Sequence, residues 1–295
     1  MSRTHASSSP SRVETQSAED RFFNYCLWEY APLAAPAGKL HPATLLYHSF
    51  DIAGVGPRAL ELVDRIRAAI GRDRTVYGIK QTPTGLSWEF YFYDYRRRDR
   101  ERSLPVVLAA IAPLLKCPVQ PPEDLPYFMF SLDFTPALLA DAASLDELHV
   151  YIGNVGSAVS SGMNFSCTTA GRVLENFYFF FDAKKHRSDI VGKITSSGFH
   201  DLPTADPARI LWPELAECDT ICVANKRRND CIYFSGVDVQ QLLFFMERLG
   251  YPDPLAAYIR EQSGRLDHLL FDVGYDYTLD AGGLHLLRSG YYGIF

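Results

Sequence analysis

Basic side chains recur in the strand and turn segments of this chain. Lys80 ends the first strand of one hairpin, Lys226 and Arg227 lie at the turn of another, and Arg288 lies in the last strand. Arginine forms forked hydrogen bonds with phosphate oxygens and lysine acts as a point charge, so cations that converge from several strands suit a diphosphate. We therefore expect these four residues to bind an anionic ligand that carries phosphate groups.

Tyrosines accompany the cations in the same strands. Aromatic rings stabilise a cation by about 0.5 to 2 kcal/mol each, and an allylic carbocation shielded from water is one species that needs such a lining. Glu89 lies among these tyrosines and is a candidate base or anchor for an acceptor, although a surface carboxylate is an equal alternative. The predicted catalytic residues are Glu89, Tyr91 and Tyr233. The predicted substrate-binding residues are Lys80, Tyr93, Tyr151, Asn164, Lys226, Arg227, Arg288 and Tyr291, with Tyr292 as the alternative to Tyr291.

Alternating polar and apolar residues predict the strands that position these side chains. The alternation occurs in Thr75–Tyr95, Leu148–Asp182, Thr220–Gly236 and His268–Phe295. Each such strand has two faces: Trp88, Phe90 and Phe92 share one face, and Glu89, Tyr91 and Tyr93 share the other. We expect the apolar face to lie under helices and the polar face to line a lumen. The alternative is an open sheet with its polar face in water, which the many tyrosines disfavour.

The remaining segments predict helices between strand pairs. The expected helices are Asp20–Tyr30, Ala59–Ile70, Leu104–Leu115, Pro136–Ala143, Val239–Leu249 and Pro254–Gln262. Phe128–Phe134 is strand-like, Lys184–Pro213 is a connector with a weak helix or two, and the stretch with Pro32, Pro36 and Pro42 is irregular.

Strand pairs joined by tight turns are antiparallel, and a sheet of eight to ten strands tends to curl or close. We predict an α+β fold, a closed antiparallel β-barrel of about ten strands surrounded by helices, in a single domain over residues 19–295. A polar, Ser-rich tail over residues 1–18 is expected to be disordered. A two-domain α+β arrangement is the alternative.

Composition limits the class of protein. The chain has 295 residues and a formal net charge of −6, which argues against a general nucleic-acid binder but permits a local basic pocket. No apolar run reaches the length of a membrane span, and residues 1–20 lack the apolar stretch of a secretory signal, so we expect a cytoplasmic protein. The six cysteines are spread along the chain and are expected to be structural thiols.

Several catalytic motifs are missing from the sequence. It has no DDxxD-type carboxylate cluster, no HExxH and no GxSxG, and the segment GNVGSAVSSG is neither a Walker loop nor a GxGxxG motif. Classical Mg²⁺-dependent terpene synthases and common hydrolases are therefore disfavoured.

The order of helices and strand pairs, the segment KRRNDCIYFSGVDVQQLLFFMERLG and the terminal LLRSGYYGIF together resemble aromatic prenyltransferases of the ABBA barrel type. That group includes bacterial indole or phenol prenyltransferases and cyanobactin peptide prenyltransferases, and the resemblance covers most of residues 40–295. It implies a ten-stranded antiparallel barrel around a solvent-filled lumen, basic residues that bind an allylic diphosphate, and tyrosines that shield the carbocation. Two departures are that only four strand pairs are clear and that GNVGSAVSSG has no counterpart that we can place.

By position, the resemblance matches Arg227 or Lys226 to a diphosphate-binding residue and Tyr233 to the tyrosine shield, with Lys80 and Arg288 in comparable places. It implies a transferase that moves an isoprenoid group from dimethylallyl or geranyl diphosphate to an aromatic or other electron-rich acceptor, either a small molecule or a peptide. No definite cofactor is indicated, and Mg²⁺ accompanying the diphosphate stays open. One rival is a non-catalytic barrel that binds a small hydrophobic ligand. Another is an interaction scaffold that uses the basic segment at residues 96–102.

Overall fold

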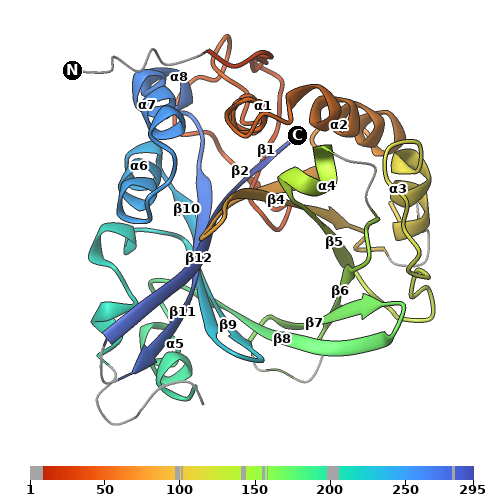
Figure 1. Cartoon of the computed structure of the whole chain (residues 1–295). Coiled ribbons are helices and arrows are strands. Elements are labelled where there is room, and N and C mark those ends of the chain that lie inside the picture. The colour runs from red at the N-terminus through yellow and green to blue at the C-terminus, as the bar shows by residue number, and fades with distance from the viewer. Residues whose placement is uncertain are drawn as a thin grey trace.

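The computed structural model describes residues 9–96, 100, 102–140, 144–154, 157, 159–197, 206–280 and 283–295. Ten strands close into one antiparallel barrel in the order β10-β11-β12-β3-β4-β5-β6-β7-β8-β9 (Figure 1). The barrel strands are β3 (Thr75–Thr82), β4 (Gly85–Tyr93), β5 (Met129–Phe134), β6 (Leu148–Gly153), β7 (Ser161–Thr168), β8 (Gly171–Asp182), β9 (Thr220–Lys226), β10 (Asp230–Val237), β11 (Phe271–Asp280) and β12 (Gly283–Ile294). The α+β fold with a closed ten-strand barrel is confirmed. The strands that were unclear in the sequence come from β5 and from the Leu148–Asp182 segment, which forms three strands.

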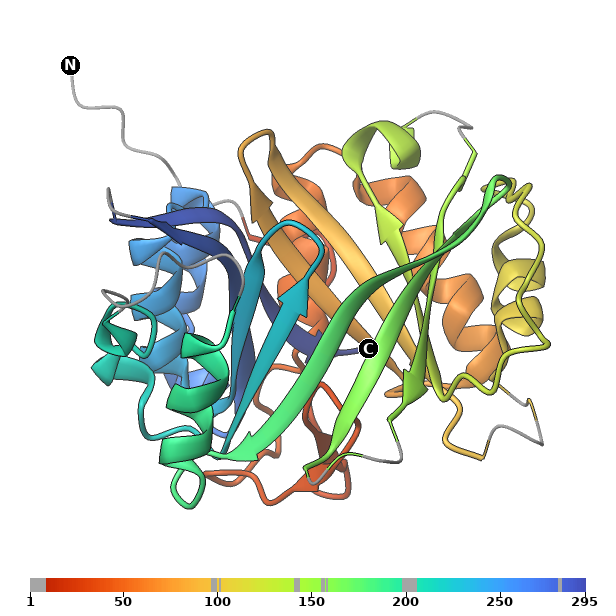
Figure 2. The same ribbon diagram turned by 90° about the horizontal axis from the view of Figure 1, so that it is seen from below.

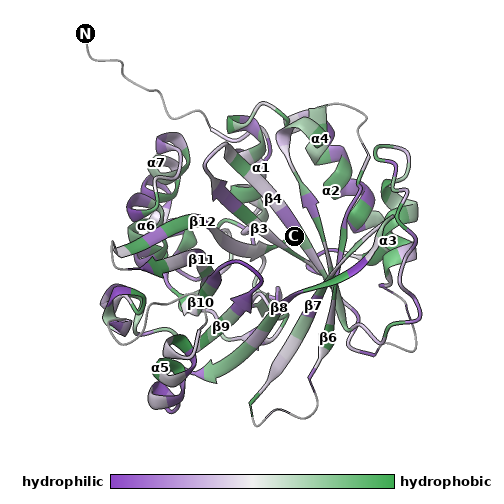
Figure 3. Cartoon of the chain, turned by 60° about the horizontal axis from the view of Figure 1, so that its bottom comes forward, coloured by the Kyte–Doolittle hydropathy of each residue, from purple (hydrophilic) through white to green (hydrophobic). Residues whose placement is uncertain are grey.

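Helices surround much of the barrel, and their ribbons carry both hydrophilic and hydrophobic positions (Figures 1 and 3). They are α1 (Ala43–Ile52), α2 (Gly56–Ile70), α3 (Leu104–Ile111), α4 (Pro136–Ala140), α5 (Arg187–Thr195), α6 (Val239–Arg248), α7 (Asp253–Glu261) and α8 (Ser263–Leu266), with short 3-10 turns at Pro207–Arg209 and Pro213–Leu215. None of the helices in the described part of the chain combines the length and apolar character needed to cross a membrane.

Two separate apolar clusters lie on opposite sides of the barrel wall. The larger cluster fills the space between sheet and helices and contains Trp88, Phe90 and Phe92 of β4. The smaller cluster lies inside the barrel and contains Tyr93 of β4 and Tyr233 of β10. The faces that the alternation predicted for β4 are therefore confirmed: one packs under helices and the other lines the lumen.

The two ends of the barrel differ. The turns β3–β4 and β9–β10 lie at one end, here called the mouth, while the N-terminal segment (red) lies across the other end (Figure 2). Pairing of β12 with β3 joins the C-terminal strand to the first barrel strand and completes the closure, with Gly290 opposite Lys80. Lumen side chains near these turns therefore lie close to the mouth, and those further along each strand lie closer to the closed end.

The helix predicted for Asp20–Tyr30 is wrong. This segment forms a small hairpin of β1 (Phe22–Phe23) and β2 (Glu29–Tyr30). The Asn24 side chain accepts hydrogen bonds from the backbone N–H groups of Cys26 and Trp28, at 2.9 and 3.0 Å, and so supports a turn in competition with a helix.

Helix α1 was missed in the sequence, where the prolines around it indicated irregular structure. Eight of its ten residues are buried, so it shows no polar face and no helical alternation of polar and apolar positions. Pro42 lies at its N-cap, where a proline is tolerated because that backbone needs no helical hydrogen bond.

Part of the predicted disordered tail has a defined place. Residues 1–8 lie outside the described residues. Ser11, however, donates a hydrogen bond to the Asp51 carboxylate, and Glu14 forms an ion pair with Arg67 at 2.6 Å. Burial alone would raise the pKa of Glu14, yet hydrogen bonds from Arg67 and Tyr47 lower it to about 2. These contacts correct the tail boundary, because the folded part of the chain begins at least eight residues earlier than expected.

Other sequence-based interpretations fall partly outside the described residues. They concern positions 97–99 and 101 of the basic segment, 141–143 of the helix expected over Pro136–Ala143, 155, 156 and 158 of the Gly/Ser-rich loop, 198–205 of the connector, and 281–282 of the last segment.

Candidate functional site

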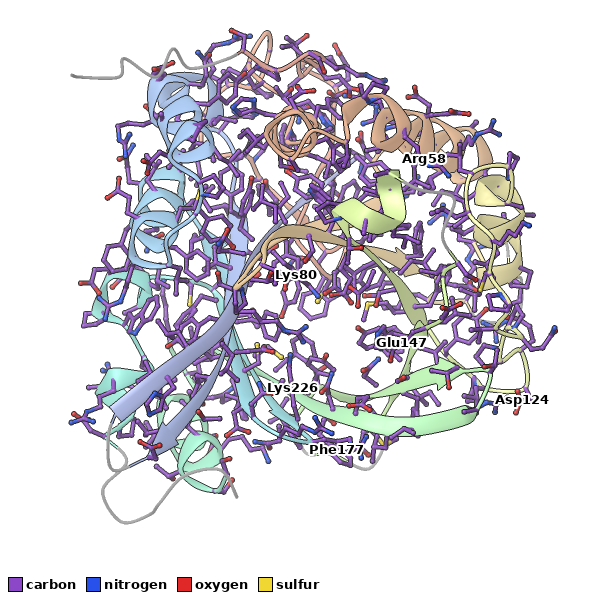
Figure 4. The ribbon with its side chains drawn as sticks, in the orientation of Figure 1. Arg58, Lys80, Asp124, Glu147, Phe177 and Lys226 are labelled. Carbon is purple, nitrogen blue, oxygen red and sulfur yellow. The ribbon has the colours of Figure 1, made fainter. Side chains whose placement is uncertain are left out.

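A cation pair shares one carboxylate near the mouth. Lys226 at the end of β9 and Arg288 of β12 each bind Asp276 of β11, with Nζ and Nε both 2.7 Å from its two oxygens. Burial pushes the pKa of Asp276 upward, but the two cations outweigh it and hold the pKa well below the ordinary range. Asp276 is thus ionised, and it fixes both cations toward the lumen (Figure 4 labels Lys226).

The opposite wall carries a second charged group. Lys80 of β3 binds Glu89 of β4 and lies 3.5 Å from Asp133 of β5. Burial disfavours the charged amine, but Asp133 and Glu89 raise the pKa of Lys80 above its ordinary value. His149 of β6 lies 3.5 Å from Asp133, and this contact outweighs burial and raises the pKa of the imidazole. The chamber therefore holds cations and carboxylates in near balance.

Glu89 connects the charged chamber to the aromatic lining. Its Oε1 accepts a hydrogen bond from Ser131 Oγ at 2.6 Å, while Lys80 binds Oε2. The Tyr151 hydroxyl lies 3.2 Å from Ser131 Oγ and 3.5 Å from Glu89 Oε1. Glu89 is buried, so the alternative of a surface carboxylate is wrong.

Five phenol rings form a closed ring around the lumen, here called the tyrosine belt. Neighbouring ring centroids are separated by 6.4, 5.9, 6.4, 6.1 and 5.9 Å in turn around the lumen. The members, in that order, are Tyr91, Tyr151, Tyr178, Tyr233 and Tyr292, from β4, β6, β8, β10 and β12. Burial raises the pKa of every member well above the ordinary value for tyrosine, so all five are neutral phenols at pH 7.

The belt lies deeper in the barrel than the charged chamber. On β12, Arg288 is closer to the mouth than Tyr292, and on β4 Glu89 is closer than Tyr91. The empty space of the charged chamber, open solvent included, is about 490 Å³, and that of an apolar chamber that continues below it is about 510 Å³. The belt lines both chambers, so a single ligand can place a charged group in one and an apolar group in the other.

Glycines opposite two belt members make room for the rings. Gly274 of β11 pairs with Tyr233, and a Cβ at this position would lie 2.4 Å from Cδ1 of that ring. Gly78 of β3 pairs with Tyr292, and a Cβ there would lie 2.7 Å from Cε1. The rings of Tyr233 and Tyr292 can therefore lie flat over the neighbouring strand.

Most of the predicted site residues meet in the lumen. Lys80, Glu89, Tyr91, Tyr151, Asn164, Lys226, Tyr233 and Arg288 all line the charged chamber. Asn164 accepts a hydrogen bond from Asn176 at 3.1 Å. Tyr93 lies lower and lines the apolar chamber, where its hydroxyl bonds the backbone carbonyl of Tyr25.

Two predicted site residues lie elsewhere. Tyr291 faces the helices and packs against Tyr251, with ring centroids 5.8 Å apart, so the prediction that it lines the lumen is wrong and Tyr292 takes that place. Arg227 lies at the rim of the mouth, half exposed, and binds Glu175 at 3.1 Å. Arg227 borders the cavity at the mouth, whereas Lys226 also lines the charged chamber.

Several lumen residues were not among the predicted site residues. Asp133, His149 and Asp276 were not chosen, although their strand positions share the polar face. Tyr178 lies in a strand of consecutive aromatic residues, so alternation could not assign its face, and a bulge after Asn164 shifts the register there. For Tyr292 the sequence did contain a signal. It lies an even number of residues from Arg288, and such residues share one face of a strand.

The described residues contain no group of three or more His, Cys, Asp or Glu side chains placed to hold a metal ion. All six cysteines are free thiols and five of them are buried, as expected for structural thiols. Comparison of the chain with models of known families and with curated proteins finds no match. The function is therefore inferred from the fold and from the geometry of the lumen.

Proposed function

We propose that this chain is a transferase that attaches an isoprenoid group from an allylic diphosphate to an aromatic or other electron-rich acceptor. The observation that carries the proposal is the order of layers in the lumen: cations at the mouth, a closed tyrosine belt directly below, and an apolar chamber at the closed end. An allylic diphosphate has the same order of chemistry along its length. Its diphosphate meets the cations, its C1 meets the phenols and its hydrocarbon tail meets the apolar chamber.

The cations retain donors for a ligand. Arg288 uses Nε for Asp276, and its two Nη groups donate no hydrogen bond to a described residue. Lys226 gives one hydrogen bond to Asp276, which leaves two of its three N–H donors. These donors would bind the diphosphate oxygens while Asp276 holds both side chains in place.

The proposed reaction breaks one bond and forms another. The C1–O bond of the donor breaks, its electron pair leaves with the diphosphate, and an allylic cation remains inside the tyrosine belt. The phenol faces stabilise this cation, each by about 0.5 to 2 kcal/mol. A nucleophilic carbon, nitrogen or oxygen of the acceptor then bonds C1 and loses a proton.

Glu89 is the proposed acceptor of that proton. In the ligand-free barrel its carboxylate is held by Lys80 and Ser131. A diphosphate would draw Lys80 toward itself, because its charge exceeds that of one carboxylate, and this would release Glu89 Oε2 toward the substrates. The acceptor would enter at the mouth. His149, Lys226 and Arg288 line part of a cavity there of about 730 Å³, open solvent included.

The sequence resemblance to aromatic prenyltransferases of the ABBA barrel type supports the same proposal. That family combines a ten-stranded antiparallel barrel with lumen cations and tyrosines, and the closed barrel of this chain has the corresponding architecture. Membership itself stays part of the proposal.

The test combines binding and turnover. Purified protein is titrated calorimetrically with dimethylallyl and geranyl S-thiolodiphosphates, which resist ionisation. It is then incubated with the natural diphosphates, with and without Mg²⁺, and a panel of indoles, phenols and aromatic peptides. We expect binding of at least one analogue and a prenylated product by mass spectrometry. Absence of binding by every diphosphate would overturn the proposal.

A non-catalytic binding protein is the second candidate. The observation that favours it is the charge balance of the chamber, where Lys80, Lys226 and Arg288 are already paired with carboxylates. This hypothesis predicts that a hydrophobic ligand is retained without turnover. It also expects Glu89→Gln to change affinity only, whereas the transferase loses turnover while still binding the donor analogue.

A further inference from the structure

The closed end of the lumen is built by a segment outside the barrel. Residues 21–30, here called the floor hairpin, contain β1 and β2 and lie across the strand ends (Figure 2). Tyr25 at its turn points its ring into the lumen, where the centroid lies 6.1 Å from that of Tyr233 with the planes 20° apart. The same ring lies 6.0 Å from Tyr292 and 6.3 Å from Phe180. Tyr25 therefore touches the tyrosine belt from below.

Main-chain hydrogen bonds hold the floor hairpin in this position. The Tyr25 N–H donates to Asp272 Oδ2 of β11 at 2.6 Å, and its carbonyl accepts from the Tyr93 hydroxyl. The next carbonyl, that of Cys26, accepts from the Tyr95 hydroxyl at 2.7 Å. Because these bonds use the backbone of Tyr25 and Cys26, the hairpin keeps its anchors when the Tyr25 side chain is replaced.

The chamber above Tyr25 is apolar, and the Tyr25 ring is part of its lining. The lining is almost entirely aromatic and aliphatic: Tyr25, Phe128, Met129, Gly162, Phe180, Tyr93 and the belt. A hydrocarbon chain whose diphosphate binds at the mouth would extend into this chamber and meet the Tyr25 ring. Its length would then be limited where its end meets that ring.

We propose that Tyr25 is a specificity-determining residue that limits the length of the isoprenoid donor, by forming the floor against which the end of the hydrocarbon chain abuts. The inference rests on the proposed function. The phenol ring of Tyr25 is comparable in size to one isoprene unit. Removing it should therefore admit a donor longer by about one unit, without changing the cations at the mouth.

The experiment compares binding of S-thiolodiphosphates that carry dimethylallyl, geranyl and farnesyl chains, with inorganic diphosphate as a head-group probe. Titration calorimetry is run on the unaltered chain, Tyr25→Ala and the matched control Tyr25→Phe, which keeps the ring. For Tyr25→Ala we expect the affinity for the longer chain relative to the shorter to rise about tenfold or more, since even one methylene changes selection by that order. Tyr25→Phe and the affinity for inorganic diphosphate should stay unchanged.

Two further variants keep the inference falsifiable. Tyr25→Leu retains apolar packing and should shift the preference in the same direction by a smaller factor, which covers the case in which Tyr25→Ala does not fold. Gly162→Ala adds a Cβ that lies 3.3 Å from the Ile152 carbonyl oxygen and 4.0 Å from Phe128 Cε1, and it should shift the preference toward the shorter chain.

The outcomes separate the two proposals. If the unaltered chain binds no diphosphate at all, the proposed function fails and the donor specificity fails with it. If it binds the analogues but folded Tyr25→Ala and Tyr25→Leu keep the original chain-length preference, Tyr25 does not limit the donor and only this inference is overturned.

Discussion

Asp272 and Asp276 lie on the same strand, face the same lumen and are both buried, yet their surroundings shift their pKa values in opposite directions. Asp276 near the mouth has two cations, which outweigh burial and lower its pKa. Asp272 at the closed end lies among hydrogen-bond donors and the carboxylate of Asp219. Burial raises its pKa to about 7, against the hydrogen bonds from Ser235 and from the N–H groups of Tyr25 and Gly236.

This difference shows how one barrel holds two environments. On β8 the lumen residue near the turn is polar and those two and four positions deeper are aromatic, namely Asn176, Tyr178 and Phe180. Asp272 of β11 is an exception at the closed end, and its raised pKa reflects burial there. The mouth is therefore built to hold charge, whereas the closed end disfavours it. A ligand with a charged head and an apolar tail fits this gradient in one orientation only.

The largest expected effect concerns Asp272 and the pH dependence of stability. Its folded-state pKa of about 7 lies above the ordinary value of 3.8, so the folded chain retains a proton that the unfolded chain has lost. The free energy of unfolding should therefore fall as the pH rises from about 4 to about 7, by up to about 1.4 kcal/mol per pH unit. Asp272→Asn should remove this contribution. Urea unfolding at several pH values measures it, and parallel profiles for the variant and the unaltered chain would contradict the prediction.

Asp276→Asn is the matched control on the same strand. Because the folded-state pKa of Asp276 is lowered, its contribution to stability is present above the ordinary pKa and is lost as the pH falls below about 4. The variant should be destabilised at pH 7, and its difference from the unaltered chain should shrink in acid. If both variants changed the free energy of unfolding with the same sign and over the same pH range, the two ends of the lumen would not differ in their electrostatic environment.

The next largest effect separates a lumen cation from a rim cation. Lys226 and Arg227 are adjacent, but only Lys226 faces the charged chamber, where its side chain is 9% exposed against 53% for Arg227. Lys226→Met removes a charge-assisted hydrogen bond of about 1.5 to 3 kcal/mol, so donor-analogue binding should weaken roughly 10- to 100-fold. Arg227→Met should weaken it by less than about threefold, since exposed ion pairs contribute little. If calorimetry showed equal losses of donor-analogue affinity for the two variants, the diphosphate would be placed at the rim.

The glycine between the two carboxylates of β11 offers a third test. Gly274 lies between Asp272 and Asp276, and a Cβ there would meet the Tyr233 ring at 2.4 Å. Gly274→Ala should displace this ring, lower stability by about 1 to 3 kcal/mol and reduce turnover. Gly192→Ala in α5 is the control, because a Cβ there meets nothing within 4 Å. Thermal unfolding and product formation for both variants measure the contrast, and an undisturbed Gly274→Ala protein would show that the ring needs no such space.

Much of this arrangement could be predicted from the sequence, where alternation was regular. In β4 and β10 every second residue faces the lumen, and Glu89, Tyr91 and Tyr233 were assigned to the correct face. Strand pairing through short turns also predicted the closed antiparallel barrel.

The remainder depends on information that alternation does not contain. The choice between adjacent Tyr291 and Tyr292 is the exception, because an even count from Arg288 assigns Tyr292 to the lumen face. The bond from Lys226 to Asp276 joins residues 50 positions apart and follows only from the closed barrel. Tyr25 reaches the lumen from a hairpin outside the barrel, so no strand pattern could reveal it.

The smallest expected effect tests the tyrosine belt itself. If Tyr233 stabilises a cation that exists only during the reaction, Tyr233→Leu should lower kcat by about 2- to 30-fold, equivalent to 0.5 to 2 kcal/mol, while donor-analogue affinity stays nearly constant. Tyr233→Phe retains the π face and should keep most of the activity, and Tyr291→Phe on the outer face should leave kcat unchanged. Steady-state kinetics together with calorimetry separate the two quantities. A fall in analogue affinity without a fall in kcat would assign Tyr233 to ground-state packing of the donor, and the belt would then serve to bind the donor and not to stabilise the cation.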